Sequence, residues 1–405
     1  MHSTERRSLL RSSVVLASGA LLGVSARAQE KRPSGKADPV TAEPGKAKSG
    51  SEKQIIRTLG RTGLRVPVVS MGVMNSGNPA LVRAAIEAGM THFDTAHGYQ
   101  KGRNEEMLGN VFKDYPRDSF TLATKVPSES GDSSAAVLAW LSKVDVSLER
   151  LQMDSVDILY LHSVGSRARA LAPSMLDALQ KAKESGRTRF VGLSTHSNEP
   201  EVLDAAVESG VYDVVLTAVN FKQDHYPSVK AAIARAAEAG VGIVAMKTMA
   251  GGYYDKAKTR PINCKAALKF IMQDPHVTTA IPGFTTFDQL AENNSVNYDI
   301  TLTEEERDAL AAGSLEGGLY CQQCSQCVSG CKNQLPIPTY MRAYMYTYGY
   351  RNLGLAHAVL SEVGTRENPC LDCDTCTAEC VKGFPVRERI EDVRRVSGIP
   401  EEMLG

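Results

Sequence analysis

The sequence predicts an α/β fold, a (β/α)8 TIM barrel followed by a small helical domain. Three observations lead to this prediction. Helical and strand patterns alternate eight times over about 250 residues, the usual size of such a barrel. The strands are continuous apolar runs, as expected when both faces of a parallel sheet are buried. Eight of the nine cysteines lie near the C-terminus, after the alternation has ended, so that region is set apart from the barrel.

The alternation begins at residue 55 with a hairpin-like stretch that turns between Gly60 and Gly63. Residues 68–73 then form the first expected strand, and an amphipathic helical pattern precedes each later strand. A doubly wound open sheet is the alternative, and it is disfavoured because no Gly-x-Gly-x-x-Gly follows the first strand. The later strands are expected at 91–96, 120–126, 155–162, 189–195, 212–220, 241–248 and 277–283, with a last helix at 287–295.

Composition excludes some classes of function. The hydrophobic content is 42% and the charged content 23%, which is typical of a soluble globular protein. The 46 Lys and Arg residues balance 46 Asp and Glu residues. Because there is no basic excess, we expect no nucleic-acid partner.

Residues 1–28 have the pattern of an export signal. Arg6 and Arg7 precede a modest apolar stretch at 14–24, which is shorter than the about 20 residues of a membrane span, and a small-residue cleavage site follows at 26–28. The arginine pair resembles a twin-arginine signal, so we expect a periplasmic or otherwise exported protein with no stable membrane span after cleavage. An ordinary secretory signal or an uncleaved anchor is the alternative. Residues 29–52, rich in Lys, Pro, Gly, Ala and Ser, are expected to be a flexible linker.

Polar residues stand at the ends of successive predicted strands. Since the active sites of such barrels lie at the C-terminal ends of the strands, these residues are candidates for a functional site. They are Asp94, Lys125, His162, Ser194, Asn220 and Lys247.

Four residues together have the chemistry needed to protonate a carbonyl oxygen while hydride arrives at its carbon. Tyr99 has an ordinary pKa of about 10, and a neighbouring Lys125 ammonium is expected to lower it. Asp94 would keep Lys125 charged and oriented. His162 would hydrogen-bond the carbonyl oxygen and polarise it. Taken singly, each residue is an ordinary polar group of a barrel mouth, so the prediction depends on the set.

Ordered motifs at residues 55–310 resemble the aldo/keto reductase family. The matching segments are FDTAHGY, GRNEEMLG, ATK, VDILYLH, GRTRFVGLS and IPGFTTFDQLAEN. The resemblance implies that Tyr99 is the general acid/base, that Asp94 and Lys125 tune it, and that His162 orients the carbonyl. It also implies that NAD(P)H binds in extended form across the barrel mouth.

The resemblance further implies a set of cofactor contacts, and part of that set departs from the family. Thr195 and Ala218 stand where the family has Asn and Gln, and the stretch 283–289 has no basic residue for a 2′-phosphate. Without such residues a phosphate loses charge-assisted hydrogen bonds, so the choice between NAD, NADP and neither is left open. The implied cofactor residues are Ser194, Thr195, Asn220, Lys247, Gly283, Gln289, Glu292 and Asn293.

Two cysteine runs, CQQCSQCVSGC and CLDCDTCTAEC, share the spacing C-x2-C-x2-C-x3-C. This spacing is typical of two [4Fe-4S] clusters in which the fourth cysteine of each run ligates the other cluster. Disulfides or zinc are the alternatives. The predicted ligand sets are Cys321, Cys324, Cys327 and Cys380 for one cluster, and Cys370, Cys373, Cys376 and Cys331 for the other.

The region of the two runs, with the Tyr- and Met-rich stretch between them, resembles the helical ferredoxin-like appendage of a branch of aldo/keto reductase-like proteins. We therefore expect a barrel at 53–312 and a ferredoxin-like iron-sulfur domain at 313–405. The expected function is an oxidoreductase of carbonyl or alcohol substrates, sugars among them, that exchanges electrons with the clusters and with a redox partner protein. The alternative is a non-catalytic or weakly catalytic electron-transfer protein on an inherited barrel.

Overall fold

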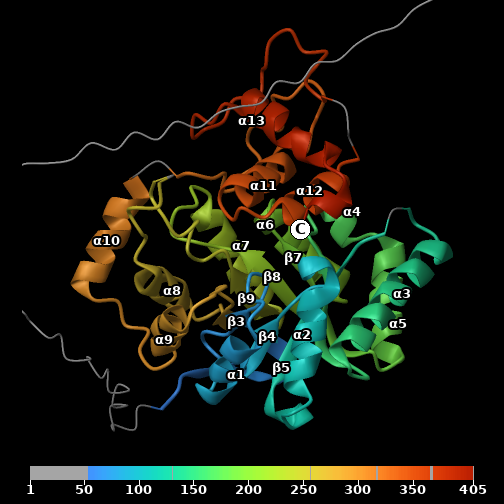
Figure 1. Ribbon diagram of the computed structural model, residues 1–405, viewed down its shortest axis with the longest axis vertical. Helices are drawn as coiled ribbons and strands as arrows, with labels where there is room; N and C mark the ends of the chain where they lie inside the picture. The colour runs from blue at the N-terminus through green and yellow to red at the C-terminus, as the bar shows by residue number, and fades with distance from the viewer. Residues whose placement is uncertain (1–52, 130, 256, 316–317, 365–367, 405) are drawn as a thin grey trace, which may run out of the picture. The chain divides into compact units, whose positions relative to one another are not determined.

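The computed structural model describes residues 53–129, 131–255, 257–315, 318–364 and 368–404 (Figure 1). The predicted signal at 1–28 and linker at 29–52 lie outside the described residues. The described residues form one compact unit, which contains both the sheet and the cysteine-rich region.

Eight parallel strands form one sheet in which every strand pairs with its neighbours in chain order. Parallel bridges from Val69 to Ala280 and from Gly72 to Gly283 join the first strand to the last, so the sheet closes into a barrel. The predicted barrel is confirmed, and closure excludes the open doubly wound sheet. The strands are β3 (Met71–Gly72), β4 (His92–Asp94), β5 (Thr121–Pro127), β6 (Val156–His162), β7 (Thr188–Thr195), β8 (Val214–Ala218), β9 (Gly242–Met246) and β10 (Thr279–Ala280).

The predicted N-terminal hairpin is present and packs against the barrel. Strands β1 (Ile56–Thr58) and β2 (Arg65–Pro67) pair antiparallel around the 3-10 turn η1 (Gly60–Thr62). Gly60 has φ 49, and a Cβ there would lie 2.3 Å from the backbone nitrogen of Gly242. Only glycine therefore fits where the hairpin meets the start of β9.

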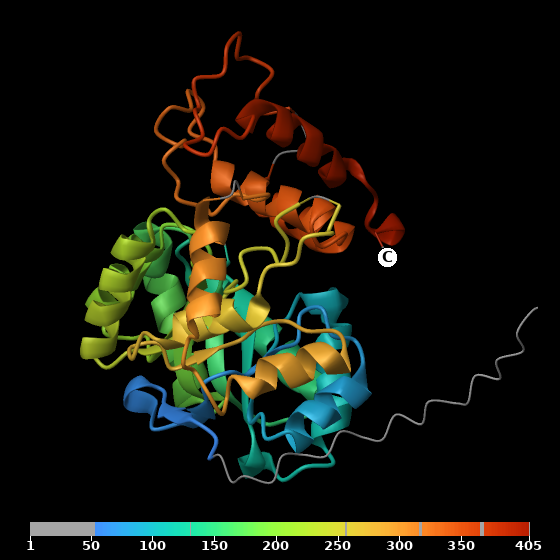
Figure 2. The ribbon, with the colours of Figure 1, turned by 90° about the vertical axis from the view of Figure 1, so that its left-hand side faces the viewer.

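Helices surround the sheet and bury their apolar faces against it (Figures 1 and 2). Side chains of Asn78 and Ser133 cap the helices that follow them, which satisfies backbone N–H groups that a helix leaves free. The helices are α1 (Pro79–Glu87), α2 (Arg103–Phe112), α3 (Ser134–Leu151), α4 (Arg167–Ala170), α5 (Pro173–Glu184), α6 (Glu199–Ser209), α7 (Tyr226–Glu238), α8 (Cys264–Met272), α9 (Phe287–Ser295) and α10 (Glu304–Leu315), with the 3-10 turns η2 (Tyr99–Gly102) and η3 (Arg117–Ser119).

The C-terminal region is helical, as predicted, and has a hydrophobic core of its own. Its elements are α11 (Ile337–Tyr348), α12 (Leu353–Ser361), α13 (Val386–Val393), η4 (Arg394–Gly398) and η5 (Glu401–Met403). Their apolar faces meet around Met341, Leu360 and Ile390, and Cys327 and Cys370 belong to the same core. Across the residues that the structure describes, no helix has the length and apolar character to span a membrane.

Candidate active site and cysteine centre

The barrel brings the predicted polar side chains to one end of its sheet. Asp94 ends β4, Lys125 lies in β5 and His162 ends β6. Because parallel strands end on the same side, all three lie at the same mouth of the barrel. The remaining strand-end residues follow this pattern, with Ser194 and Thr195 ending β7, Asn220 after β8 and Lys247 after β9.

Asp94 and Lys125 form a buried ion pair at this mouth. The Lys125 ammonium donates to Asp94 Oδ1 and, at 2.5 Å, to the carbonyl oxygen of Thr95. The two side chains are 2% and 1% exposed. Burial raises the pKa of Asp94 and lowers the pKa of Lys125, while their mutual attraction opposes both shifts. The predicted pair is therefore present, with each charge held by the other.

Tyr99 lies beside this pair, at the start of η2. Two residues of left-handed conformation, Gln100 and Lys101, follow it and turn the chain sharply. Lys125 Nζ lies 5.0 Å from the centre of the Tyr99 ring. The His162 ring packs edge-on against Tyr99 with 6.0 Å between ring centroids. The structure therefore brings together the four residues that the sequence predicted to act as a set.

The pKa of Tyr99 shifts in the direction opposite to the one expected. We expected Lys125 to lower it, whereas burial and then the charge of Asp94 raise the pKa of Tyr99 above its ordinary value. The physical reason is that Lys125 directs its ammonium at Asp94, so the phenol faces an ion pair rather than an isolated cation. Tyr99 therefore keeps its proton at neutral pH, which is the form that an acid needs.

Two histidines lie at the mouth, and only His162 was predicted. His196 directly follows Thr195 at the end of β7, is 7% exposed, and has its ring centroid 6.4 Å from that of His162. Burial and then neighbouring cations hold the pKa of both imidazoles well below the usual value, so both are neutral at pH 7. The rule that polar residues end the strands would have found His196 if it had been extended by one position.

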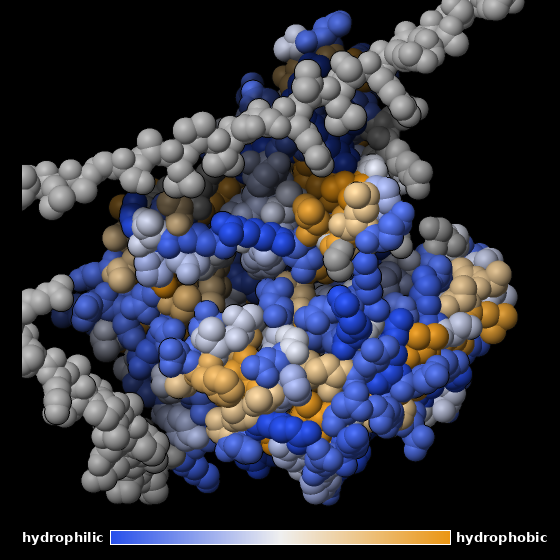
Figure 3. Space-filling model, viewed as in Figure 1, coloured by the Kyte–Doolittle hydropathy of each residue, from blue (hydrophilic) through white to orange (hydrophobic). Residues whose placement is uncertain are grey.

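A cavity of about 1020 Å³ lies at the mouth of the barrel and includes Asp94, Tyr99 and His196 in its wall. This volume is at the upper end of the range for small-molecule and cofactor sites. On the side of the molecule shown in Figure 3, which has the orientation of Figure 1, hydrophilic residues dominate and apolar patches lie between them. Six of the eight predicted cofactor residues line the cavity, namely Asn220, Lys247, Gly283, Gln289, Glu292 and Asn293.

The other two predicted cofactor residues are not in the cavity wall. Ser194 and Thr195 are fully buried, and their hydroxyl groups already have partners. The Ser194 hydroxyl accepts from the backbone nitrogen of Ser163 at 2.9 Å, and the Thr195 hydroxyl donates to the carbonyl oxygen of Ser197 at 2.9 Å. In this structure both residues brace the β7 end instead of facing a ligand.

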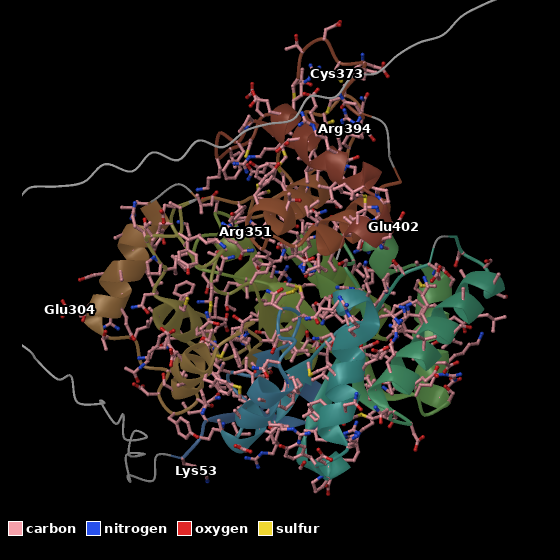
Figure 4. The ribbon with its side chains drawn as sticks, in the orientation of Figure 1. Lys53, Glu304, Arg351, Cys373, Arg394 and Glu402 are labelled. Atoms are coloured by element: carbon pink, nitrogen blue, oxygen red, sulfur yellow. The ribbon has the colours of Figure 1, made fainter. Side chains whose placement is uncertain are left out.

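Several polar atoms of the cavity wall fit a polar ligand. Four buried ones have no hydrogen-bond partner among the described residues, although buried polar atoms are nearly always partnered. Lys258 and Arg351 also line the cavity and supply cations that the stretch 283–289 lacks; Figure 4 labels Arg351. The whole cavity wall therefore offers positive charge to an anionic dinucleotide, although the stretch 283–289 alone has none. The four unpartnered atoms are Asp94 Oδ2, His196 Nδ1, Thr248 Oγ1 and Asn293 Oδ1.

The C-terminal region forms part of the same cavity, which sequence reasoning did not foresee. Asn220 Nδ2 donates to Gln322 Oε1 at 3.0 Å, and Lys258 Nζ donates to the carbonyl oxygen of Gly349 at 3.0 Å. The cavity is therefore built by two regions that lie far apart in the sequence. The C-terminal residues in its wall are Tyr320, Cys321, Gln322, Gln323, Met345, Tyr346, Gly349, Tyr350, Arg351 and Asn352.

The eight C-terminal cysteines gather in two groups of four, and none forms a disulfide. A small pocket is lined by Cys331 together with Cys370, Cys373 and Cys376. The other group is electrostatically coupled, since Cys321 interacts with Cys324, Cys327 and Cys380. The grouping matches the two crossed ligand sets that the spacing predicted. Cys321 lines the large cavity, whereas Figure 4 shows Cys373 at the outer end of the C-terminal region.

The chemistry of these thiols fits a cationic inorganic centre. Burial first, and then neighbouring cysteine thiolates, raise the pKa of Cys321 to about 12 and that of Cys327 to about 11. Four thiolates so close together are stable only with cations between them. Within the described ranges, no three His, Cys, Asp or Glu side chains converge on the position of a single metal ion. A four-iron cluster is larger than one ion and holds its ligands farther apart.

Comparisons with known protein families match two separate segments of the chain. Residues 73–266 match the model of the aldo/keto reductase family, and residues 320–385 match the 4Fe-4S dicluster domain. The chain is 29% identical to L-galactose dehydrogenase of Arabidopsis thaliana over 286 residues, which cover 59% of this chain and 86% of that protein. It is 33% identical to L-glyceraldehyde 3-phosphate reductase of Escherichia coli K12 over 163 residues, which cover 35% of this chain and 46% of that protein.

Solved structures show the same barrel fold. The holo form of aldo-keto reductase AKR11C1 from Bacillus halodurans aligns with a TM-score of 0.54 at 23% identity, over 64% of this chain and 96% of that one. An aldo-keto reductase from Klebsiella pneumoniae in complex with NADPH aligns with a TM-score of 0.53 at 22% identity, over 64% of this chain and 95% of that one.

Proposed function

We propose that this chain, whose residues 73–266 match the aldo/keto reductase family and whose residues 320–385 match the 4Fe-4S dicluster domain, is an oxidoreductase of that family. It interconverts carbonyl and alcohol groups at Tyr99 and exchanges electrons with its own clusters. One observation carries the proposal. Tyr99, on the wall of the mouth cavity, is packed against Lys125 and His162, and Cys321 lines the same cavity.

Tyr99 acts as the general acid. Its raised pKa keeps the hydroxyl protonated, and the proton passes to the substrate oxygen as that oxygen gains negative charge. The Asp94–Lys125 pair places a fixed dipole beside the phenolate that is left behind. Neutral His162 donates an N–H to the carbonyl oxygen and orients it towards Tyr99.

The implied cofactor residues that line the cavity would hold a nicotinamide dinucleotide there. When bound, the dinucleotide supplies hydride chemistry and the two [4Fe-4S] clusters supply one-electron chemistry. Six of the eight implied residues line the cavity, and Lys258 and Arg351 would meet the negative charge of the phosphates. One cluster would be held by Cys321, Cys324, Cys327 and Cys380, and the other by Cys331, Cys370, Cys373 and Cys376.

We also propose that the protein is exported in folded form with its clusters in place. The motivation is the pair Arg6 and Arg7 ahead of a short apolar stretch. Fractionation of cells would test this, because replacing both arginines with lysine should retain the protein in the cytoplasm. Export of that variant at the normal level would contradict the proposal.

The substitution Tyr99→Phe tests the proposed chemistry. Purified protein with intact clusters is mixed with candidate aldehydes, ketones and alcohols, and substrate-dependent change in the cluster absorbance is followed. Loss of the general acid should slow the reaction by about 10²- to 10⁴-fold. Tyr298→Phe, at a partly exposed position on the barrel surface, is the control that should leave the rate unchanged. An unchanged rate in Tyr99→Phe would refute the proposed role.

A second candidate function is electron transfer without carbonyl chemistry. It is favoured by the residues at the positions where the resemblance implies contacts to the nicotinamide. Ser194 and Thr195 make internal hydrogen bonds there, and Ala218 presents no polar group. Native mass spectrometry of the purified protein separates the two functions. A retained dinucleotide supports the reductase, whereas clusters alone support the electron-transfer protein or a variant without nicotinamide.

A further inference from the structure

Arg342, a residue of the dicluster domain, places a buried positive charge at the barrel mouth. It lies in α11, one helical turn before Tyr346, which lines the cavity. Its side chain is 5% exposed. Burial lowers the pKa of His162, of His196 and of Lys247, and the charge of Arg342 lowers each of them further. The guanidinium therefore lies within electrostatic reach of all three barrel side chains.

The hydrogen bonds of Arg342 are incomplete. Its Nη2 donates to Glu362 Oε2 at 3.2 Å, but its Nε is buried and has no partner. His196, which is 7% exposed and lines the cavity, also has an unpartnered ring nitrogen, Nδ1. A buried donor without an acceptor costs about 1–3 kcal/mol, so such atoms usually mark the place of a missing ligand or water.

The surrounding charges favour an anion at this place. Asp94 is already neutralised by Lys125. Glu362 is shared, because it pairs with Arg342 and its charge also attracts Arg169, where it opposes the lowering of the pKa by burial. Two further carboxylates lie near the mouth, namely Glu199, which attracts Lys247, and Glu292 in the cavity wall. The cavity wall also holds Lys247, Lys258 and Arg351, so the cations near the mouth outnumber the carboxylates.

We propose that Arg342 and His196 bind a carboxylate of the substrate, so that the enzyme acts on oxo acids and the corresponding hydroxy acids, uronic acids among them. This inference rests on the proposed function of Tyr99. The planar guanidinium offers a carboxylate a donor that is always charged, and His196 in the Nδ1–H tautomer offers a second. The dicluster domain thus contributes to substrate recognition as well as to electron transfer.

Equilibrium binding to the full-length protein with its clusters tests the inference. The ligands are matched pairs that differ in one carboxylate, namely glucuronate with glucose, galacturonate with galactose, and glyoxylate with glycolaldehyde. At least one acid should bind more tightly than its neutral counterpart, by calorimetry or intrinsic fluorescence. Arg342→Gln should weaken binding of that acid roughly 10- to 100-fold while changing binding of the neutral ligand less than about twofold.

Two further variants keep the test interpretable. Arg389→Gln is the matched control, since Arg389 is also a buried arginine of the dicluster domain with an unpartnered nitrogen, Nη1, but its guanidinium stacks over the ring of Phe384. Arg342→Lys keeps the charge and should recover part of the affinity for the acid. If Arg342→Gln loses its clusters, the double variant Arg342→Gln, Glu362→Gln replaces the pair without leaving a carboxylate alone.

The outcomes separate this inference from the proposed function. Equal affinity of the matched ligands, or equal weakening of both by Arg342→Gln, overturns the carboxylate site. Preferential binding of phosphate esters over all the acids also overturns it. If Tyr99→Phe abolishes turnover of neutral carbonyls while acids have no advantage, the proposed function stands and only this inference fails. If acids bind preferentially but no carbonyl or alcohol is ever turned over, the proposed function fails and the anion site stands.

Discussion

The substitution Lys125→Met should destabilise the barrel in a manner that depends on pH. The methionine keeps the length of the side chain but removes the ammonium, so Asp94 loses its cation in a site where it is 2% exposed. Its other oxygen, Oδ2, has no partner that could compensate. A carboxylate in that position is expected to fold in the protonated form rather than remain a buried, unpaired charge.

The size of the effect follows from the proton that Asp94 must take up. An unfolded aspartate has a pKa of about 3.9, and each pH unit above that value costs about 1.4 kcal/mol. At pH 7 the variant should therefore lose about 4 kcal/mol of unfolding free energy relative to wild type. The folded pKa is raised above the unfolded one, so this penalty is largest at high pH and shrinks to about 1.5 kcal/mol at pH 5.

The single tryptophan of the chain provides the measurement. Trp140 is fully buried in α3, and its indole N–H donates to the carbonyl oxygen of Val126, the residue after Lys125, at 3.4 Å. Its fluorescence during urea unfolding reports on the barrel at each pH. The control Lys143→Met, which breaks the partly exposed pair with Glu129, should cost at most about 1 kcal/mol at either pH.

A double variant completes the test. Replacing Asp94 with Asn as well as Lys125 with Met removes the carboxylate, so most of the lost stability should return and its pH dependence should disappear. The reasoning is refuted if the penalty of Lys125→Met is the same at pH 5 and pH 7, or if the double variant is no more stable than the single one.

Three further predictions concern the clusters, the pH profile and the packing of the barrel. Substituting Cys327 and Cys380 together should remove one ligand set and leave about half of the iron, whereas substituting Cys327 and Cys331 should damage both sets and lose nearly all of it; equal iron contents would contradict the crossed ligation. Because the pKa of Tyr99 is raised, its phenol should stay protonated and the rate of carbonyl reduction should not fall through loss of that proton up to pH 10. A decline near pH 8 in the wild type that is absent from Tyr99→Phe would argue against the protonated phenol. Gly192→Ala should destabilise the barrel by about 1–3 kcal/mol in urea titrations, since its Cβ would lie 2.4 Å from a carbonyl oxygen and 2.7 Å from a buried ring, and an unchanged midpoint would contradict the packing.

The features that the sequence predicted correctly depend on residues that lie close together in the chain. A run of apolar residues that ends in Asp94 or His162 marks both a buried strand and its functional end, since strand polarity alone decides where the side chain emerges. The cysteine spacing carries its own geometry in the same way, because three ligands lie within seven residues. Such patterns need no knowledge of the tertiary structure.

The features that the sequence did not reveal depend on contacts between distant segments. Arg342 reaches the barrel mouth from a helix about 180 residues after His162, and Gln322 meets Asn220 across a separation of 102 residues. The shift in the pKa of Tyr99 was predicted in the wrong direction. Lys125 lies beside Tyr99 as expected, but its ammonium points at Asp94 rather than at the phenol. Charge effects need the positions of atoms, which short motifs do not supply.

The crossed ligation that we predict for the cysteines would have a consequence for biosynthesis. While the chain is being made on the ribosome, the first run emerges with three ligands of the cavity-side cluster, and the fourth, Cys380, follows 53 positions after Cys327. That cluster therefore cannot be completed before almost the entire protein has been translated and the C-terminal helices can fold. Iron would enter a barrel that already has its shape, and a prematurely terminated chain would lack the cluster nearest its active site. With this order of ligands, only a nearly full-length polypeptide would supply all four ligands of that cluster.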